Sequence, residues 1–93
     1  MCGITGILNF NPVENVRPGM LKNMTDPINH RGPDDEGYYI NNNLGLGFKR
    51  LSIIDLKSGH QPLSNKEKNI WITFNGEIYN YKSLRKELIS KNY

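Results

Sequence analysis

Cys2 carries the most evident chemistry of this 93-residue chain, because it directly follows the initiator methionine and is the single cysteine. If Met1 is removed, Cys2 has both a thiol and a free α-amine, and the amine can accept the proton of its own thiol. Thiols and α-amines hold their protons about equally firmly, so this transfer is close to balanced at neutral pH. The position therefore predicts either a self-activated nucleophile or a small buried residue, and free cysteines are often the latter.

Asn75-Gly76 is a second candidate for chemistry, because it places a side-chain amide next to a glycine, whose backbone no side chain covers. Asn-Gly is typical of tight hairpin turns, which would make the pair purely structural. The residues that follow, 77–80, lead into a helical pattern and not into a return strand. A simple turn is therefore disfavoured at this position.

The apolar pattern of the N-terminal half predicts a strand followed by a helix. Residues 2–9 form a mostly apolar run and predict a buried strand, whose two glycines suit the close approach of another backbone. Pro18 fits the first turn of a helix, and Pro27 predicts that this helix ends or kinks near Asp26. The apolar face of the helix is predicted to comprise Met20, Leu21, Met24 and Ile28.

The C-terminal half predicts a hairpin, a long loop, a strand and a second helix. The segments are strands 37–40 and 44–50 around an Asn-rich turn at 41–43, an ordered loop over 51–67, a strand over 69–74 and a helix after residue 80. Asn80 is expected to cap this helix, whose apolar face holds Tyr81, Leu84 and Leu88. This order of elements predicts the fold class α+β.

Four motifs in order along the chain resemble the class II glutamine amidotransferase domain, whose nucleophile is its N-terminal residue. They are Met1-Cys-Gly-Ile-Thr-Gly6, His30-Arg-Gly-Pro-Asp34, Arg50-Leu-Ser-Ile-Ile-Asp55 and Asn75-Gly-Glu-Ile-Tyr-Asn80. The Pro33-Asp34 variant and the Arg50-Leu-Ser-Ile run resemble the glutamine-hydrolysing asparagine synthetase branch. The resemblance implies part of an αββα sandwich of the Ntn-hydrolase type, with residues 1–93 as an incomplete N-terminal portion truncated after its second helix.

By this resemblance, Cys2 attacks the side-chain amide of glutamine, a γ-glutamyl thioester forms, ammonia leaves, and water releases glutamate. Asn75 and Gly76 match the oxyanion-hole donors of the family. Arg50 matches the residue that holds the substrate α-carboxylate, which a planar guanidinium can bind with two hydrogen bonds; a surface arginine closing a hairpin is the alternative. Glu77 matches a residue near the substrate α-ammonium, or else is an acid of the first helical turn.

Further matches are expected to support the pocket. Backbone groups of Leu51 and Ile53 are implied as substrate contacts. A loop is implied to pack beside the nucleophile, with a structural role ahead of a catalytic one, through His30, Arg31 and Asp34.

Cofactors and partners follow from the same resemblance. No cofactor and no metal site is expected in residues 1–93, because the two histidines lack metal-ligand spacing and the acidic run 34–36 lacks the EF-hand pattern. ATP and Mg²⁺ are expected in an absent C-terminal synthetase domain that uses the ammonia, and a homodimer is left open. Two alternatives stay open: another class II amidotransferase, or a catalytically incompetent fragment that acts as a folding or binding module.

Composition and charge indicate whether a nucleic-acid-binding, membrane or secreted protein is expected. The net charge of +3 comes from scattered Lys and Arg, so a nucleic-acid partner is not expected. The sequence shows no bilayer-spanning apolar run and no secretory signal, and a single cysteine favours a reducing, cytoplasmic setting. Phe48 stands where many members of the family carry a histidine, which leaves no polar side chain there.

Overall fold

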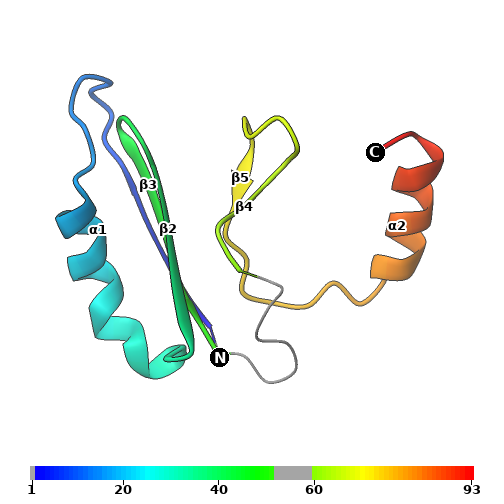
Figure 1. Cartoon of the computed structure of the whole chain (residues 1–93), viewed down its shortest axis with the longest axis horizontal. Coiled ribbons are helices and arrows are strands. Elements are labelled where there is room, and N and C mark those ends of the chain that lie inside the picture. The colour runs from blue at the N-terminus through cyan, green and yellow to red at the C-terminus, as the bar shows by residue number, and fades with distance from the viewer. Residues whose placement is uncertain (1, 52–59) are drawn as a thin grey trace.

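The computed structural model describes residues 2–51 and 60–93, and Figure 1 shows their arrangement. The elements are β1 (Gly3–Leu8), α1 (Pro18–Thr25), a 3₁₀ helix η1 (Asp26–Arg31), β2 (Asp35–Asn41), β3 (Leu44–Arg50), β4 (Leu63–Ser64), β5 (Trp71–Ile72) and α2 (Tyr81–Ser90). In these two ranges the fold is α+β, as predicted. An antiparallel sheet has the order β1-β3-β2, and β4 and β5 form a second sheet.

The β2–β3 hairpin confirms the turn that its asparagines predict. Asn42 adopts a positive φ of 51°, a conformation that asparagine tolerates better than most residues, and Asn41 pairs with Leu44 across the turn. The first strand of the hairpin begins at Asp35, two residues earlier than predicted. On the other side of β3, β1 runs antiparallel from the pair Gly3 and Lys49 onward, so β3 is the central strand.

From one side of the molecule to the other, the elements follow the order α1, three-stranded sheet, β4–β5 pair and α2 (Figure 1). Side-chain alternation along β2 explains how the sheet is covered on both faces. Asp35, Gly37 and Tyr39 share one face, and Tyr39 stacks there on Trp71 of β5 with ring centroids 3.9 Å apart. Glu36 lies on the opposite face and forms an ion pair with α1.

α1 is confirmed, and it ends at Thr25 next to the predicted boundary, but only part of its predicted apolar face is buried. Leu21 and Thr25 are fully buried, whereas Met20 and Met24 are 45% and 42% exposed. The cause lies in β3, where two glycines let the helix side chains rest directly on the strand backbone. A Cβ at Gly45 would lie 3.3 Å from Leu21 Cδ2 and would also crowd Val16.

Thr25 is buried despite its hydroxyl because that hydroxyl is fully used. Its Oγ1 donates to the carbonyl of Leu21 at 2.7 Å and lies 2.8 Å from Thr5 Oγ1 on β1. A buried hydroxyl with hydrogen-bond partners avoids the cost of an unmet donor. A side chain at Gly47 would collide with both threonine hydroxyls, so this glycine makes room for the pair.

β1 is confirmed as a strand, but the prediction that it is buried is wrong. Ile4 and Leu8 are 49% and 58% exposed, because β1 is an edge strand of the sheet and the β4–β5 pair leaves these two side chains partly uncovered. The covered side chains of the sheet lie instead on its central strand, where Phe48 is 2% exposed.

The second sheet is shorter than the sequence predicts. The predicted strand 69–74 is reduced to Trp71–Ile72, and its partner Leu63–Ser64 lies in the predicted loop 51–67, of which 52–59 are outside the described residues. The turn between them is closed by Asn65, whose side-chain Oδ1 accepts from two backbone N–H groups at 3.0 Å. The Asn65 side chain thereby satisfies two backbone N–H groups that would pair with a neighbouring strand if β4 and β5 were longer.

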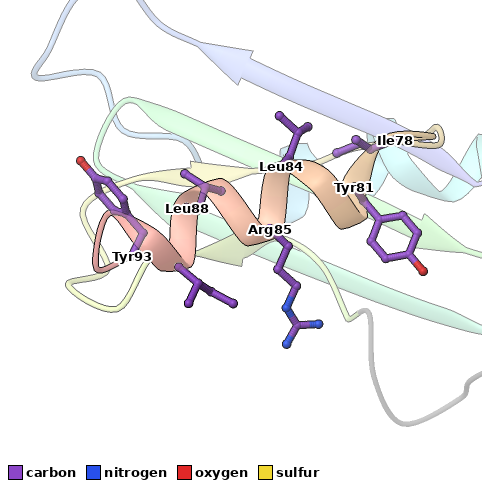
Figure 2. Close-up of a pocket in the computed structure, with 7 residues that line it drawn as sticks. Ile78, Tyr81, Leu84, Arg85, Leu88 and Tyr93 are labelled. Atoms are coloured by element: carbon purple, nitrogen blue, oxygen red, sulfur yellow. The ribbon is translucent and has the colours of Figure 1, made fainter.

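α2 confirms the predicted second helix, but the Asn80 side chain makes no capping hydrogen bond because its backbone is not in the extended conformation of a cap. No residue of α2 is buried. An apolar hollow of 550 Å³ runs along it, and Figure 2 shows the side chains of that hollow. They are Ile78, Tyr81, Leu84, Arg85, Leu88, Ile89 and Tyr93. Among the described residues, no helix has the length and apolar character to cross a membrane.

Candidate active site

The thiol of Cys2 lies at the junction between the start of β1 and the end of β3. β1 begins at Gly3, which pairs with Lys49, so Cys2 stands beside the residues that follow β3. The backbone N–H of Leu51 donates to Cys2 Sγ at 3.4 Å, and Sγ lies 3.9 Å from the carbonyl oxygen of the same residue. The antiparallel register of the two strands therefore fixes where the sulfur sits.

The carbonyl oxygen of Cys2 accepts two hydrogen bonds from distant parts of the chain. Arg31 Nε donates to it at 3.3 Å, and Asn75 Nδ2 donates to it at 3.0 Å. These two donors come from η1 and from the segment between β5 and α2. The fold thus gathers a thiol, a guanidinium and a side-chain amide, three groups suited to acyl transfer, at one point.

Arg31 is held in place by tight packing of the next residues against β3. Pro33 forms a bridge with Arg50, and the Asp34 N–H donates to the Arg50 carbonyl at 2.9 Å. A Cβ at Gly32 would lie 2.5 Å from the backbone of Lys49, so only glycine allows this approach. The His-Arg-Gly-Pro segment is therefore locked onto the end of the central strand.

A pocket of 280 Å³ opens next to the thiol. It is lined by Cys2, Gly3, Ile4, Ile28, Arg31 and Asn75. This volume is close to the lower end of the ~300–1,000 Å³ typical of small-molecule sites and suits a ligand of amino-acid size. The residues that line the larger hollow along α2 include no thiol, so the small pocket is the candidate active site.

Ile28 belongs to this pocket, whereas the sequence pattern predicts only that it lies on the apolar face of a helix. Its Cδ1 atom would lie 2.6 Å from a Cβ at Gly3, so the isoleucine covers the residue next to the nucleophile. The signal that could have found it is the glycine itself, because a glycine after a catalytic residue indicates that something packs closely there.

A charged network joins the α1 side of the sheet to β3. The buried Lys49 side chain pairs with Glu36, and its Nζ lies 3.9 Å from Asp26. Lys22 on α1 pairs with the same two carboxylates at 3.2 and 3.7 Å. The hydrogen bond from Lys49 holds the pKa of Glu36 below its ordinary value. Burial raises the pKa of Tyr38, whose hydroxyl donates to Glu36 at 3.3 Å. The network thereby anchors β3 where it approaches the site.

The structure brings together four of the predicted site residues: Cys2, Arg31, Leu51 and Asn75. Five others do not line the pocket: His30, Asp34, Arg50, Gly76 and Glu77.

Two further positions complete the comparison with the predicted site. Ile53 lies outside the described residues, so its implied contact stays a prediction. Phe48 pairs with Ile4 in the β-sheet register and is a core side chain, which fits the absence of a polar group at that position.

Comparison with known proteins decides the family. Residues 1–93 match the family described as "Glutamine amidotransferase domain". The chain belongs to this family. It is 48% identical over 95 residues to the glutamine-hydrolysing asparagine synthetase 1 of Bacillus subtilis (strain 168), covering 100% of this chain and 15% of that relative.

Other similar relatives carry the same description. The glutamine-hydrolysing asparagine synthetase 2 of Bacillus subtilis is 47% identical over 90 residues, covering 95% of this chain and 12% of the relative. The glutamine-hydrolysing asparagine synthetase 1 of Arabidopsis thaliana is 42% identical over 88 residues, covering 95% and 15%. The chain therefore spans about one seventh of the length of these curated relatives.

Proposed function

We propose that this chain is the N-terminal portion of the glutamine-hydrolysing part of an asparagine synthetase, with Cys2 as its nucleophile. The observation that carries the proposal is the hydrogen bond from the side-chain amide of Asn75 to the backbone carbonyl of Cys2, 73 positions away in sequence, which places both residues in the wall of one pocket. A thiol and a side-chain amide donor in one pocket are the kinds of group that acyl transfer uses, as nucleophile and as oxyanion donor. The described pocket beside them has the size of an amino-acid site.

In the proposed reaction, the Cys2 sulfur attacks the side-chain carbonyl carbon of glutamine. The thiol proton passes to the α-amine of Cys2, which is free once Met1 is removed, and that amine then protonates the departing nitrogen. The C–N bond breaks, ammonia leaves and a γ-glutamyl thioester remains. Water then attacks the thioester and releases glutamate and the thiol.

Asn75 and Gly76 are the proposed donors to the oxyanion that forms in both steps. A side-chain amide has two N–H groups, and one of those on Asn75 is used on the Cys2 carbonyl. That bond would hold the amide in place while its second N–H faces the substrate oxygen. Gly76 would supply its backbone N–H from the next position along the chain.

Substrate recognition is proposed to come from the end of β3 and the segment after Asn75. Arg50 would bind the α-carboxylate with two hydrogen bonds, and Glu77 would face the α-ammonium. Backbone groups of Leu51 and Ile53 would complete the contacts. His30, Arg31 and Asp34 would support the nucleophile, for which the bond from Arg31 to the Cys2 carbonyl gives direct support.

For the whole protein, we propose the activity that the names of the relatives print. A synthetase portion would follow this segment in sequence and would use ATP and Mg²⁺, and no step assigned to residues 1–93 involves either. The layer order of Figure 1 supports a portion of an αββα sandwich. We further propose a cytoplasmic protein, for which a homodimer is one arrangement.

Intact-mass measurement after incubation with a glutamine-mimicking diazoketone tests the nucleophile. The expected mass shows loss of Met1 and one added group on Cys2, and the Cys2→Ala variant gains no mass. In the full-length protein, Asn75→Ala is expected to lower kcat for glutamine hydrolysis ~100- to 1,000-fold, the usual effect of removing an oxyanion donor.

Two results would contradict the proposal: alkylation that persists in Cys2→Ala, or ammonia release by a full-length protein that retains Met1. Another class II amidotransferase is the competing function. Glutamine-dependent ATP consumption that requires aspartate supports an asparagine synthetase, and consumption without aspartate supports its competitor. The 48% identity to a glutamine-hydrolysing asparagine synthetase favours the former.

A further inference from the structure

Gln61 makes a two-bond clamp on the backbone of Phe74. Its side-chain Oε1 accepts from the Phe74 N–H at 2.6 Å, and its Nε2 donates to the Phe74 carbonyl at 3.1 Å. β5 ends at Ile72, two residues earlier, so this clamp continues the pairing that a strand neighbour would otherwise supply. Both polar groups of one backbone residue are thereby fixed by one side chain.

Gln61 is in turn held against β2 of the three-stranded sheet, the sheet whose strand β1 begins directly after Cys2. Its backbone carbonyl lies so close to Gly37 of β2 that any side chain at position 37 would collide with it. The preceding residue, His60, places Nδ1 2.7 Å from Asp35 Oδ2, and this bond holds the pKa of Asp35 below its ordinary value. Asp35 and Gly37 share the face of β2 that meets the second sheet, so the brace and the Tyr39 stack are parts of one contact.

Phe74 lies directly before the two proposed oxyanion donors. The next residue is Asn75, whose amide reaches the Cys2 carbonyl at 3.0 Å. The Phe74 ring then folds over Gly76, because a Cβ at position 76 would lie 2.9 Å from Phe74 Cζ. The orientation of one peptide backbone at Phe74 therefore sets the positions of both donors.

We propose that Gln61 is a positioning residue for glutamine hydrolysis, which transmits the position of β2 to Asn75 and Gly76 through Phe74. The inference rests on the function proposed above and adds a residue to which the resemblance assigns no role. Gln61 does not line the pocket, so its action is indirect. Preorganised donors lose effect steeply when displaced, and a 1 Å error can cost ~100-fold in rate.

The experiment replaces Gln61 in the full-length protein by Leu, which removes both bonds, and by Glu, which keeps the acceptor but loses the donor. Asn65→Ala is the matched control, since the Asn65 side chain also makes two bonds to backbone N–H groups, at the β4–β5 turn away from the pocket. Trp71 fluorescence, which is sensitive to its stacking on Tyr39, reports whether each variant keeps the second sheet in place.

We expect Gln61→Leu to lower kcat for glutamine hydrolysis ~10- to 100-fold with KM changed less than ~3-fold, because the displaced groups act on the transition state. Synthesis with added ammonia in place of glutamine should keep its rate, since it bypasses the Cys2 site. Asn65→Ala should lower stability without lowering kcat.

Gln61→Glu supplies a readout that a purely structural role would not move. The ionised carboxylate accepts from the Phe74 N–H but cannot donate to the Phe74 carbonyl, whereas the protonated acid does both. The ratio of its kcat to that of the unaltered protein should therefore rise as the pH is lowered. Taking the ratio cancels any pH effect on the nucleophile.

Three outcomes overturn the inference. They are an unchanged kcat in Gln61→Leu, a loss in Asn65→Ala as large as that in Gln61→Leu, and a pH-independent ratio for Gln61→Glu. Absence of glutaminase activity in the unaltered full-length protein overturns the proposed function first and this inference with it. Glutaminase activity of the unaltered protein thus distinguishes a failure of the proposed function from a failure of the role assigned to Gln61.

Discussion

Replacing Arg31 by Met measures what the guanidinium contributes by holding the Cys2 carbonyl. Methionine keeps an unbranched stem of similar reach in the pocket wall and removes the Nε donor, which lies 3.3 Å from the carbonyl oxygen. A hydrogen bond from a charged group is worth about 1.5–3 kcal/mol. Two features reduce that value here: the distance is long for an N–H···O bond, and the same oxygen keeps the bond from Asn75 at 3.0 Å.

We therefore expect a loss of about 1–1.4 kcal/mol, which corresponds to a roughly 5- to 10-fold slower reaction at Cys2. The assay is the second-order rate constant for Cys2 alkylation by the glutamine-mimicking diazoketone, followed by intact mass. Arg31→Lys keeps the charge but not the planar donor, so it should recover only part of the loss. Arg17→Met is the matched control, because Arg17 is exposed at the start of α1.

An alkylation rate within about 2-fold of the unaltered protein in Arg31→Met would refute this reasoning, since the estimated loss is larger. So would a full recovery in Arg31→Lys, which would show that charge alone matters and that the bond to the Cys2 carbonyl does not. Equal slowing by Arg17→Met would show a general effect of lost positive charge on binding of the reagent.

Two further predictions concern stability, followed by urea unfolding with Trp71 fluorescence. Thr25→Val should lower the free energy of unfolding by about 1–2 kcal/mol, because it removes a buried hydroxyl and leaves that of Thr5 without its partner; an unchanged midpoint would contradict it. Folding lowers the pKa of Glu36 from its ordinary value of 4.5 and the pKa of Asp35 from its ordinary value of 3.8. The two ionised carboxylates therefore contribute fully to the free energy of unfolding above these values, and this contribution is lost as the pH falls below them. Stability should therefore decline below about pH 4.5, and a stability that rises on acidification would contradict this.

Local chemistry explains which elements could be predicted from the sequence. The hairpin turn follows from asparagines that tolerate positive φ, and the end of α1 follows from a proline two residues beyond Thr25. Leu21 could be predicted as part of the apolar face of α1, but the burial of Thr25 in place of Met20 and Met24 could not, because it depends on Gly45 and Gly47 of a strand some 20 residues later. An apolar pattern predicts that a face exists, but the partner surface decides which residues are covered.

In the candidate site, too, residues within motifs could be predicted from the sequence, whereas residues whose role depends on contacts distant in sequence could not. Motifs that resemble a known family indicated Cys2 and Asn75 together, and the structure joins them through one hydrogen bond. Gln61 gave no such signal, since its partner Phe74 is 13 residues away and no periodicity links the two positions. Ile28 was visible as an apolar residue, yet its contact with Gly3 depends on how η1 folds back over β1.

The candidate site lies at the junction between the three-stranded sheet and the β4–β5 sheet. Cys2 directly precedes β1, Leu51 directly follows β3 and Arg31 ends the 3₁₀ helix η1, whereas Asn75 lies shortly after β5 of the second sheet. A small slide of one sheet over the other would move the Asn75 amide away from the Cys2 carbonyl, while the bonds from Leu51 to the sulfur and from Arg31 to the carbonyl would remain. The spacing of the two sheets should therefore affect the breaking of an amide bond, which needs the Asn75 amide in place, more strongly than the reactivity of the thiol toward simple reagents.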